Sequence, residues 1–364
     1  MRKGITLFLI LFFVLGLPLP KAFAEQENRA LTLEDALNLA LSNSKDLKKA
    51  QYEVKRTEAL REKASEALSF IPAEGETYNP EIEVSWNRLL SADLNWQMSK
   101  KTLTSTTDAL VLKVCKGYWD VQVAEMKLAT MEKLTQQALI NLQNTRNRLT
   151  YGAASPSSLS EAELQWKQAQ SNEVTARHSL EDAYNAFNQL VGLGSNERPR
   201  LTDKPAYEPL EVANLDYEVQ RVIEESPSAW LAQQKVTLAK WAADMIYFSG
   251  DYTPYEVRQT ELDQAELDAA GAKELLANVT RSLYYQAKSL EEKYNTAQEA
   301  LKAAQQKLRV AQVKFDIGMI TRAELVAAEV EVTQAQDAVE EAVRNHTYLR
   351  MAFEKPWAAS GGGA

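Results

Sequence analysis

The sequence is poor in the residues that carry catalysis or cross-links. Among 364 residues there are one cysteine, Cys115, and two histidines, His178 and His346. One cysteine cannot form an intrachain disulfide, so packing or oligomerisation must hold the chain together. The histidines lie far apart in helical segments, metal-ligand spacings are absent, and no glycine-rich loop opens a helix. We therefore expect no enzyme, no metal site and no cofactor.

Long hydrophobic runs are also scarce, and the single one lies at the beginning. Arg2 and Lys3 precede an apolar run from Ile5 to Leu17, and small residues follow at 22–24. This arrangement is typical of a secretory signal peptide over residues 1–24, with an uncleaved anchor as the alternative. We expect an exported protein that begins near Glu25.

Positive charge is in deficit. Lys and Arg number 41 against 50 Asp and Glu, and removal of residues 1–24 leaves 38 against 50, a net charge of −12. The two signs alternate along the chain, without the basic clusters that bind phosphate backbones. A nucleic-acid partner is therefore not expected.

The mature chain contains a weak internal repeat. The segment beginning Tyr151-Gly152 corresponds to the one beginning Ile317-Gly318, at an offset of 166 positions, and Leu41–Ser44 corresponds to Ile223–Ser226. Repeats of this kind indicate duplicated supersecondary units. We predict a first repeat over 25–198, a proline-rich extended linker over 199–213, a second repeat over 214–355 and a flexible tail over 356–364.

Within each repeat, apolar residues recur at steps of three, four and seven. This spacing predicts long antiparallel coiled-coil helices, and frequent alanine allows the helices to approach closely. The seam residues after the two glycine turns include Leu159, Ala162, Trp166, Phe187, Leu325, Ala328, Val339 and Ala342. The fold class is mainly α, with two tandem helical hairpins.

The turns between these helices are marked by capping residues. Gly152 and Gly318 suit a left-handed C-terminal cap, because glycine lacks a Cβ atom. Ser155-Pro156 then supplies an N-cap and a proline at the first helical position, whereas Thr321 and Glu324 form a capping box. By itself this pattern is equally consistent with a simple antiparallel coiled coil.

Two short insertions interrupt the helical pattern. Near residues 80–99, Ile82, Val84 and Trp86 alternate with polar residues, and Leu94, Trp96 and Met98 do so after a turn at 87–91. Alternation predicts a small β-hairpin, either membrane-spanning or half-buried. The second insertion, near 245–255, contains Gly250 and Pro254 and has room for only one strand.

Taken together, these features resemble the TolC family of outer-membrane efflux channels. The resemblance rests on Leu31-Thr32-Leu33-Glu34-Asp35-Ala36-Leu37, the glycine turns, the Leu-x-x-Ala-Glu register after each turn, and Asn172–Arg177 leading to Leu190-Val191-Gly192. It implies a TolC-like α-helical barrel. Family members are homotrimers whose helices form a periplasmic tunnel and whose strands pool into a β-barrel in outer-membrane lipid, which the short insertions here put in doubt.

The resemblance also implies a function. The chain would be the outer-membrane tunnel of a tripartite efflux or type I secretion system, a passive conduit that docks with a periplasmic adaptor and an inner-membrane pump. By position, the adaptor-docking tip would comprise Gly152, Ala153, Ser155, Gly318, Met319 and Thr321, and the aperture would involve Arg322 and Glu324. The alternative is a soluble or envelope-associated coiled-coil structural protein without a pore.

Overall fold

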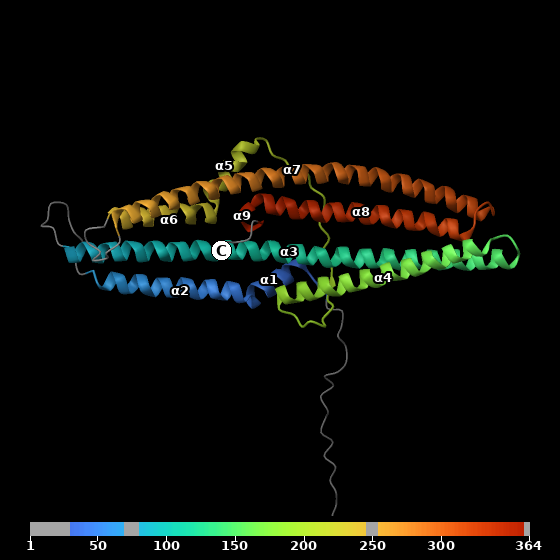
Figure 1. The fold of residues 1–364 in the computed structure, drawn as a ribbon, viewed down its shortest axis with the longest axis horizontal. Helices are drawn as coiled ribbons and strands as arrows, with labels where there is room; N and C mark the ends of the chain where they lie inside the picture. Colours follow the sequence, from blue (N-terminus) through green and yellow to red (C-terminus); the bar gives the residue numbers. More distant parts are fainter. Residues whose placement is uncertain (1–29, 69–79, 245–253, 360–364) are drawn as a thin grey trace, which may run out of the picture.

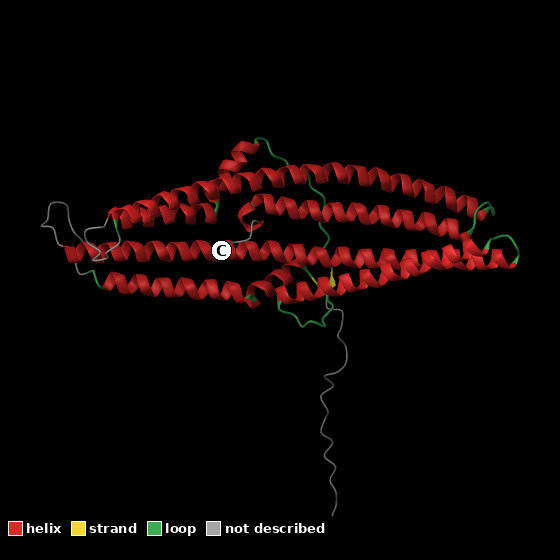
Figure 2. Cartoon of the chain, in the orientation of Figure 1, coloured by secondary structure: helices red, strands yellow, loops and turns green. Residues whose placement is uncertain are grey.

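The computed structural model describes residues 30–68, 80–244 and 254–359. These residues are almost wholly helical, apart from the two-residue strands β1 (Ala30–Leu31) and β2 (Arg200–Leu201), which pair in parallel (Figure 2). The helices, in chain order, are α1 (Leu33–Asn43), α2 (Lys45–Glu66), α3 (Pro80–Thr150), α4 (Pro156–Val191), α5 (Leu215–Glu225), α6 (Pro227–Asp244), α7 (Tyr255–Asp316), α8 (Arg322–Glu354) and α9 (Pro356–Ala359). The signal peptide expected at 1–24 and most of the insertion expected at 245–255 lie outside the described residues.

The long helices form one elongated layer (Figure 1). Helix α3 has 71 residues, about 105 Å at 1.5 Å per residue, and crosses the whole molecule. It packs against α2 and α4 on one side and against α6 and α8 on the other, and α7 packs against α6 and α8. The order across the layer is therefore α7, α8, α3, α4 in one half and α7, α6, α3, α2 in the other, which leaves α7 at one edge and α2 with α4 at the opposite edge.

The backbone shows the same duplication in both halves. Helices α1 and α2 meet at Ser44 (φ −57°, ψ 122°), and α5 and α6 meet at Ser226 (φ −63°, ψ 123°). Each serine hydroxyl accepts a backbone N–H three residues on, from Leu47 at 3.2 Å and from Ala229 at 3.3 Å. A capping hydroxyl satisfies an N–H group that the first turn leaves unpaired, so both halves restart a helix in the same way.

The β-hairpin prediction near 80–99 was wrong, because this segment is the first part of α3. Its apolar residues satisfy two periods: Trp86, Leu90, Leu94 and Met98 also recur every four residues, as one face of a helix requires. Packing against α2 favours the helical alternative. Arg61 pairs with Asp93 at 2.5 Å, and the hydroxyls of Thr57 and Ser99 lie 2.8 Å apart in the buried interface.

The flexible tail predicted over 356–364 also needs correction. Residues 356–359 form α9, whose Pro356, Trp357 and Ala358 are buried. The Trp357 indole N–H donates to the Asp108 carboxylate at 3.0 Å, and Lys355 Nζ donates to the same carboxylate at 2.6 Å. The large buried ring ties the end of the second half to α3, whereas residues 360–364 lie outside the described range.

Two apolar clusters lie near the middle of the layer. One joins α1, α3 and α4 around Val114, Tyr118 and Phe187, and the other joins α5, α7, α8 and α9 around Phe353 and Trp357. Cys115 is fully buried in the first cluster, as expected of a small apolar residue, and burial raises the pKa of its thiol to about 11. The packed middle thus holds the two hairpins in a fixed relation.

Residues 202–213, here called the strap, connect the halves by crossing the layer in an extended conformation (Figure 1). At its start, the Asp203 N–H donates to the Tyr118 hydroxyl at 3.0 Å, and Gln122 Nε2 donates to the Asp203 carbonyl at 2.8 Å. Farther on, the Leu210 N–H donates to Glu291 Oε1 at 2.8 Å. The strap therefore contacts α3 of the first half and α7 of the second.

Candidate functional site at the hairpin tips

The turn between α3 and α4 is closed by a left-handed glycine. Gly152 has φ +71°, its N–H donates to the Leu149 carbonyl at 3.0 Å, and the Ala153 N–H donates to the Arg148 carbonyl at 2.7 Å. This pair of bonds is a Schellman motif, which satisfies carbonyls at a helix C-terminus. Ser155 then caps α4, because its hydroxyl accepts the Ser158 N–H at 3.1 Å.

The turn between α7 and α8 repeats this geometry. Gly318 has φ +72°, its N–H donates to the Phe315 carbonyl at 2.9 Å, and the Met319 N–H donates to the Lys314 carbonyl at 2.8 Å. Thr321 caps α8 through a capping box with Glu324. The six residues assigned to the docking tip from the sequence thus occupy equivalent places in two matching turns.

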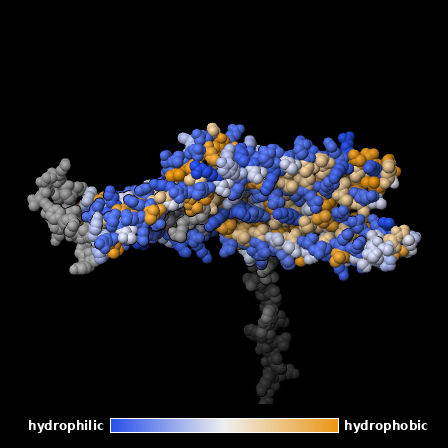
Figure 3. Space-filling model, turned by 45° about the horizontal axis from the view of Figure 1, so that its top comes forward, coloured by the Kyte–Doolittle hydropathy of each residue, from blue (hydrophilic) through white to orange (hydrophobic). Residues whose placement is uncertain are grey.

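Both turns lie at the same end of the molecule, on the right in Figure 1. All six tip residues are exposed, and Met319 retains 69% of its accessible surface. Figure 3 shows apolar side chains gathered at this end of the α7–α8 hairpin, where Val313 and Ile317 are also exposed. Exposed apolar side chains on rigid turns are typical of a contact surface for another protein.

The two aperture candidates take part in different interactions. Arg322 pairs with Glu329 at 3.8 Å. Glu324 instead accepts from the Thr321 N–H at 2.7 Å and from the Thr321 hydroxyl at 2.9 Å, and these bonds hold the pKa of its carboxyl below the usual value. Within one chain, Glu324 therefore serves the helix cap.

The open edges of the layer carry most of the exposed apolar side chains. Large exposed hydrophobic residues occur on α2, α4 and α7, and α5 carries Tyr217. Within the described residues α6 and α8 have none, and α3 has only Leu139. The edge residues are Tyr52, Leu60, Leu164, Val174, Tyr255, Val257, Leu267, Leu275, Tyr285, Val310 and Val313. Because α3, α6 and α8 are the inner helices of the layer, the exposed apolar residues lie mainly on the edge helices. Both edges therefore lack a covering partner within the described chain.

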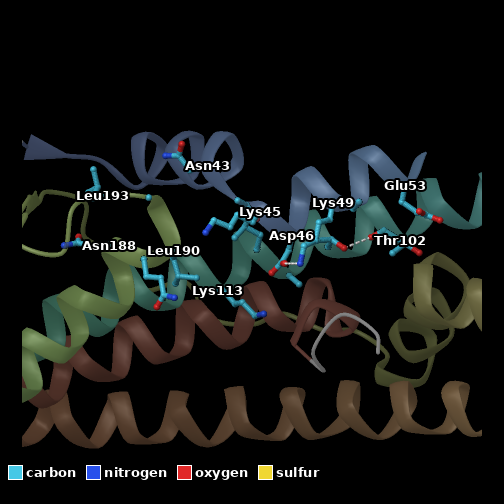
Figure 4. Close-up of a pocket in the computed structure, with 17 residues that line it drawn as sticks. Asn43, Lys45, Asp46, Lys49, Glu53, Thr102, Lys113, Asn188, Leu190 and Leu193 are labelled. Carbon is cyan, nitrogen blue, oxygen red and sulfur yellow. Dashed lines mark hydrogen bonds and ion pairs between the residues drawn. The ribbon is translucent and has the colours of Figure 1, made fainter. Parts of the chain in front are cut away.

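A cavity of about 1200 Å³ opens at the α2 and α4 edge (Figure 4). It lies where α4 ends and α2 begins beside α3, and Lys45, Lys49 and Lys113 line it together with Asp46, whose carboxylate is 3.7 Å from Lys49. The corresponding junction of the second half, between α8 and α6, is packed with α9. The first half thus has an unfilled junction at the edge of the layer.

Inside the layer, a polar seam joins the two hairpins. Thr130 of α3 donates to the Asp337 carboxylate of α8, Lys133 Nζ donates to Thr333 at 2.9 Å, and Lys127 lies 3.4 Å from Glu341. Burial raises the pKa of the Asp337 carboxyl. Sequence reasoning missed these pairs, since spacing along each helix predicts a partner face without naming the partner.

His346 is also better defined by the structure than by its sequence context. Its side chain is fully buried, whereas His178 is exposed on α4. A signal was available, because His346 follows the seam residues Val339 and Ala342 by seven and four positions. Its function in the fold depends on contacts with the strap, described below.

Comparison with known proteins agrees with this architecture. Residues 85–193, which cover most of α3, the first turn and α4, match the family model described as outer membrane efflux protein. Over this segment the chain is similar to the outer membrane efflux protein family. The matched hairpin is the unit that the chain repeats as α7 and α8.

The chain is also similar to individual bacterial proteins in sequence or in structure. Outer membrane protein TolC of Vibrio cholerae serotype O1 is 25% identical over 108 residues, which are 30% of this chain and 25% of that TolC. The outer-membrane channel OprN superposes with a TM-score of 0.65 and 14% sequence identity, covering 91% of this chain and 90% of OprN. The CmeC outer membrane channel of Campylobacter jejuni superposes with a TM-score of 0.64 and 13% sequence identity, covering 92% of this chain and 86% of CmeC. These two channels therefore share the fold of this chain.

The matched family model and the TolC relative are both named as outer-membrane proteins. Among the helices that the structure describes, none combines the length and the hydropathy of a bilayer crossing.

Proposed function

We propose that the chain is the tunnel component of an efflux or type I secretion system. Copies of the chain form a helical tube through which substrates leave passively, and the hairpin tips meet a periplasmic adaptor and, through it, an inner-membrane pump. The observation that carries the proposal is the repeated helix layer with two open apolar edges, since such a layer closes only when other copies cover its edges.

The internal repeat predicts how copies would meet. Within the chain, α3 packs against α8 and α6. Its counterpart α7 contacts the short helix α5 but has no long helices on its outer side within the described chain. The counterparts of α8 and α6 are α4 and α2 at the other edge. A head-to-tail contact of α7 with α4 and α2 of the next copy would therefore reproduce the inner seam, and the family resemblance implies closure at three copies.

The register of this contact follows from the offset of 166. The pair Thr130 and Asp337 translates to Thr296 and Ser171, and Lys133 with Thr333 translates to Glu299 and Lys167. These translated residues are exposed in the single chain. The last pair has opposite charges, as an interface between copies requires.

A cysteine pair tests this arrangement directly. We expect the double variant S171C/T296C to form a disulfide between copies under mild oxidation, giving cross-linked species up to three chains in denaturing gels. Each single variant, and the pair S171C/Q298C, are controls, because Gln298 lies about 200° around the helix from Thr296. Buried Cys115 does not compete. Detergent extracts that contain only uncross-linked single chains would contradict the proposed tube.

The second candidate is an envelope-associated coiled-coil structural protein without a pore. It is favoured by the helical state of residues 84–98, where the sequence predicted strands. Fractionation of the mature protein separates the two candidates. Recovery from the outer membrane only with detergent, as a trimer with conductance, supports the tunnel, whereas a soluble periplasmic species without conductance supports the scaffold.

A further inference from the structure

The strap is held to the second half by a small polar cluster around His346. Glu291 of α7 accepts the Leu210 N–H at 2.8 Å through Oε1, and the same oxygen lies 3.3 Å from His346 Nε2. Lys288 Nζ donates to the Leu210 carbonyl at 2.7 Å and to Glu291 Oε2 at 2.9 Å. Both backbone groups of Leu210 thus depend on α7, and one acceptor is shared by the strap and His346.

Aromatic contacts cover this cluster from the strap side. The ring of Tyr207 stacks on Tyr294 with centroids 3.8 Å apart, and its centroid lies 5.2 Å from the imidazole of His346. His346 is fully buried, and its Nδ1 has no hydrogen-bond partner. The strap residue Tyr207 is therefore part of the wall that separates this nitrogen from water.

We propose that His346 is the acid-sensitive element of a latch that closes the strap over α7 and α8. A neutral imidazole can donate from Nε2 to Glu291 and leave Nδ1 as an unprotonated nitrogen. Protonation would add a buried N–H at Nδ1 with no acceptor, which is costly in an apolar site. The strap is the part that yields, because it is an extended segment, whereas α7 and α8 are joined along a coiled coil.

The charges around His346 point in the same direction. From α7, Glu291 contacts the ring and Lys288 lies close enough to act on its charge, and from the strap Tyr207 packs against it. On its own helix, Arg350 also acts on the ring and pairs with Glu208 of the strap. Burial lowers the pKa of His346, Glu291 opposes this effect, and Arg350 and Lys288 add to it.

Glu291 supplies the fixed charge of the latch. Burial acts to raise its pKa, but hydrogen bonds from Lys288 and from the Leu210 N–H outweigh this effect, so the pKa of Glu291 lies below the usual value of a glutamate. Glu291 is therefore ionised from pH 7.5 to pH 5. Because the closed strap holds the pKa of His346 below 6.5, closure is fully favoured above pH 6.5 and is lost as the pH falls through the depressed value.

Deuterium exchange of the full mature chain tests the latch. Peptides covering 206–212 are followed from pH 7.5 to pH 5.0, with labelling times scaled for the intrinsic pH dependence of exchange, and α3–α8 seam peptides serve as the reference. We expect strap protection to fall on acidification by up to about tenfold for each unit of pKa depression at His346. The H346Q variant should lose this pH dependence, because glutamine can still donate to Glu291 but does not titrate.

His178 provides the matched control, since it is the only other histidine in the sequence and is exposed. H178Q should behave as the wild type. Equal pH responses in H346Q and wild type, or a wild-type strap insensitive to pH, would overturn the proposal.

If H346Q fails to fold, H178Q still decides the question. In H178Q the single remaining histidine is His346, and its ring can be labelled for NMR. We expect its titration midpoint to lie below pH 6.5 and to equal the pH at which the strap loses protection. A midpoint at or above 6.5, or one separated from strap opening, would equally overturn the latch.

Discussion

At the residue scale, Gly318 tests the backbone requirement of the second turn, whereas its neighbour Met319 tests the docking proposed there. Gly318 has φ +72°, and no atom lies within 4 Å of the place that a Cβ atom would occupy, so a side chain there meets strain without a steric clash. We expect Gly318→Ala to destabilise the chain by about 1–2 kcal/mol, the cost of a left-handed conformation for an L-residue. Thermal or denaturant unfolding measures this loss.

A neighbouring exposed residue supplies the contrast. Met319→Ser should leave the unfolding free energy within about 0.5 kcal/mol, because Met319 is 69% exposed, but should reduce export of a dye by cells that depend on this chain. Unchanged export in a stable M319S variant would argue against docking at this tip. A stability loss equal to that of G318A would mean that Met319 serves only the fold.

The two turns could be predicted in detail because their signals are local. A glycine followed by Ser-Pro or by Thr-x-x-Glu has the same physical consequence in any helical protein. The buried contacts of His346 and Asp337 depend on residues 55 and 207 positions away, and such partners are not encoded by local spacing. The sequence thus predicted which helix faces are buried, whereas only the folded structure shows which residues pack against each face.

At the scale of elements, the first part of α3 can be tested with proline. Ser91 lies in the turn of the hairpin that alternation predicted, where proline would be tolerated, but in the structure it lies within a continuous helix. We expect Ser91→Pro to cost about 3 kcal/mol or more, since proline removes a helical hydrogen bond and clashes with the preceding turn. Ser91→Ala is the control, and equal stability of the two variants would favour the hairpin.

The hairpin was mispredicted because short segments can satisfy two periods at once. Leu94 and Met98 fit both a strand alternation and a helical stripe, and the sequence does not show that α2 supplies Arg61 and Thr57 opposite this stripe. Tertiary contact decides between the two alternatives. The same holds for the tail, where Trp357 finds Asp108 on a helix 249 positions earlier.

Helix α9 gives a second prediction at this scale. Trp357 is 6% exposed and belongs to the cluster around Phe353. Truncation by Trp357→Ala should destabilise the chain by roughly 3–5 kcal/mol, as for other large buried aromatic residues. Trp357→Phe keeps most of the ring volume and should cost about 1 kcal/mol for the lost hydrogen bond to Asp108. Denaturant midpoints that fail to separate the two variants would show that the ring is not packed.

At the scale of the whole molecule, the open edges of the layer are the feature that favours assembly with other copies of the chain. An isolated layer leaves apolar side chains of α2, α4 and α7 in water together with the unfilled junction at the α2 and α4 edge. The proposed closure by further copies would remove both features from solvent. It would need no new kind of contact, because the α3–α8 seam already exists within each chain.

The charge pair in this proposed contact provides the last prediction. Lys167→Glu and Glu299→Lys each place like charges opposite one another, and the exchange K167E/E299K restores attraction with reversed sign. For exposed pairs about 0.2–1 kcal/mol is expected at each contact, and a closed ring contains one contact per chain, so the effects on the assembly accumulate. We expect each single variant to dissociate at lower detergent or salt concentrations than the wild type, and the double variant to recover most of the loss.

Glu299 also pairs with Lys302 of its own chain at 2.6 Å, which makes K167E the cleaner of the two single variants. Rescue requires the two residues to meet across copies, so a double variant that merely adds the defects of its parents would place the interface elsewhere on the layer.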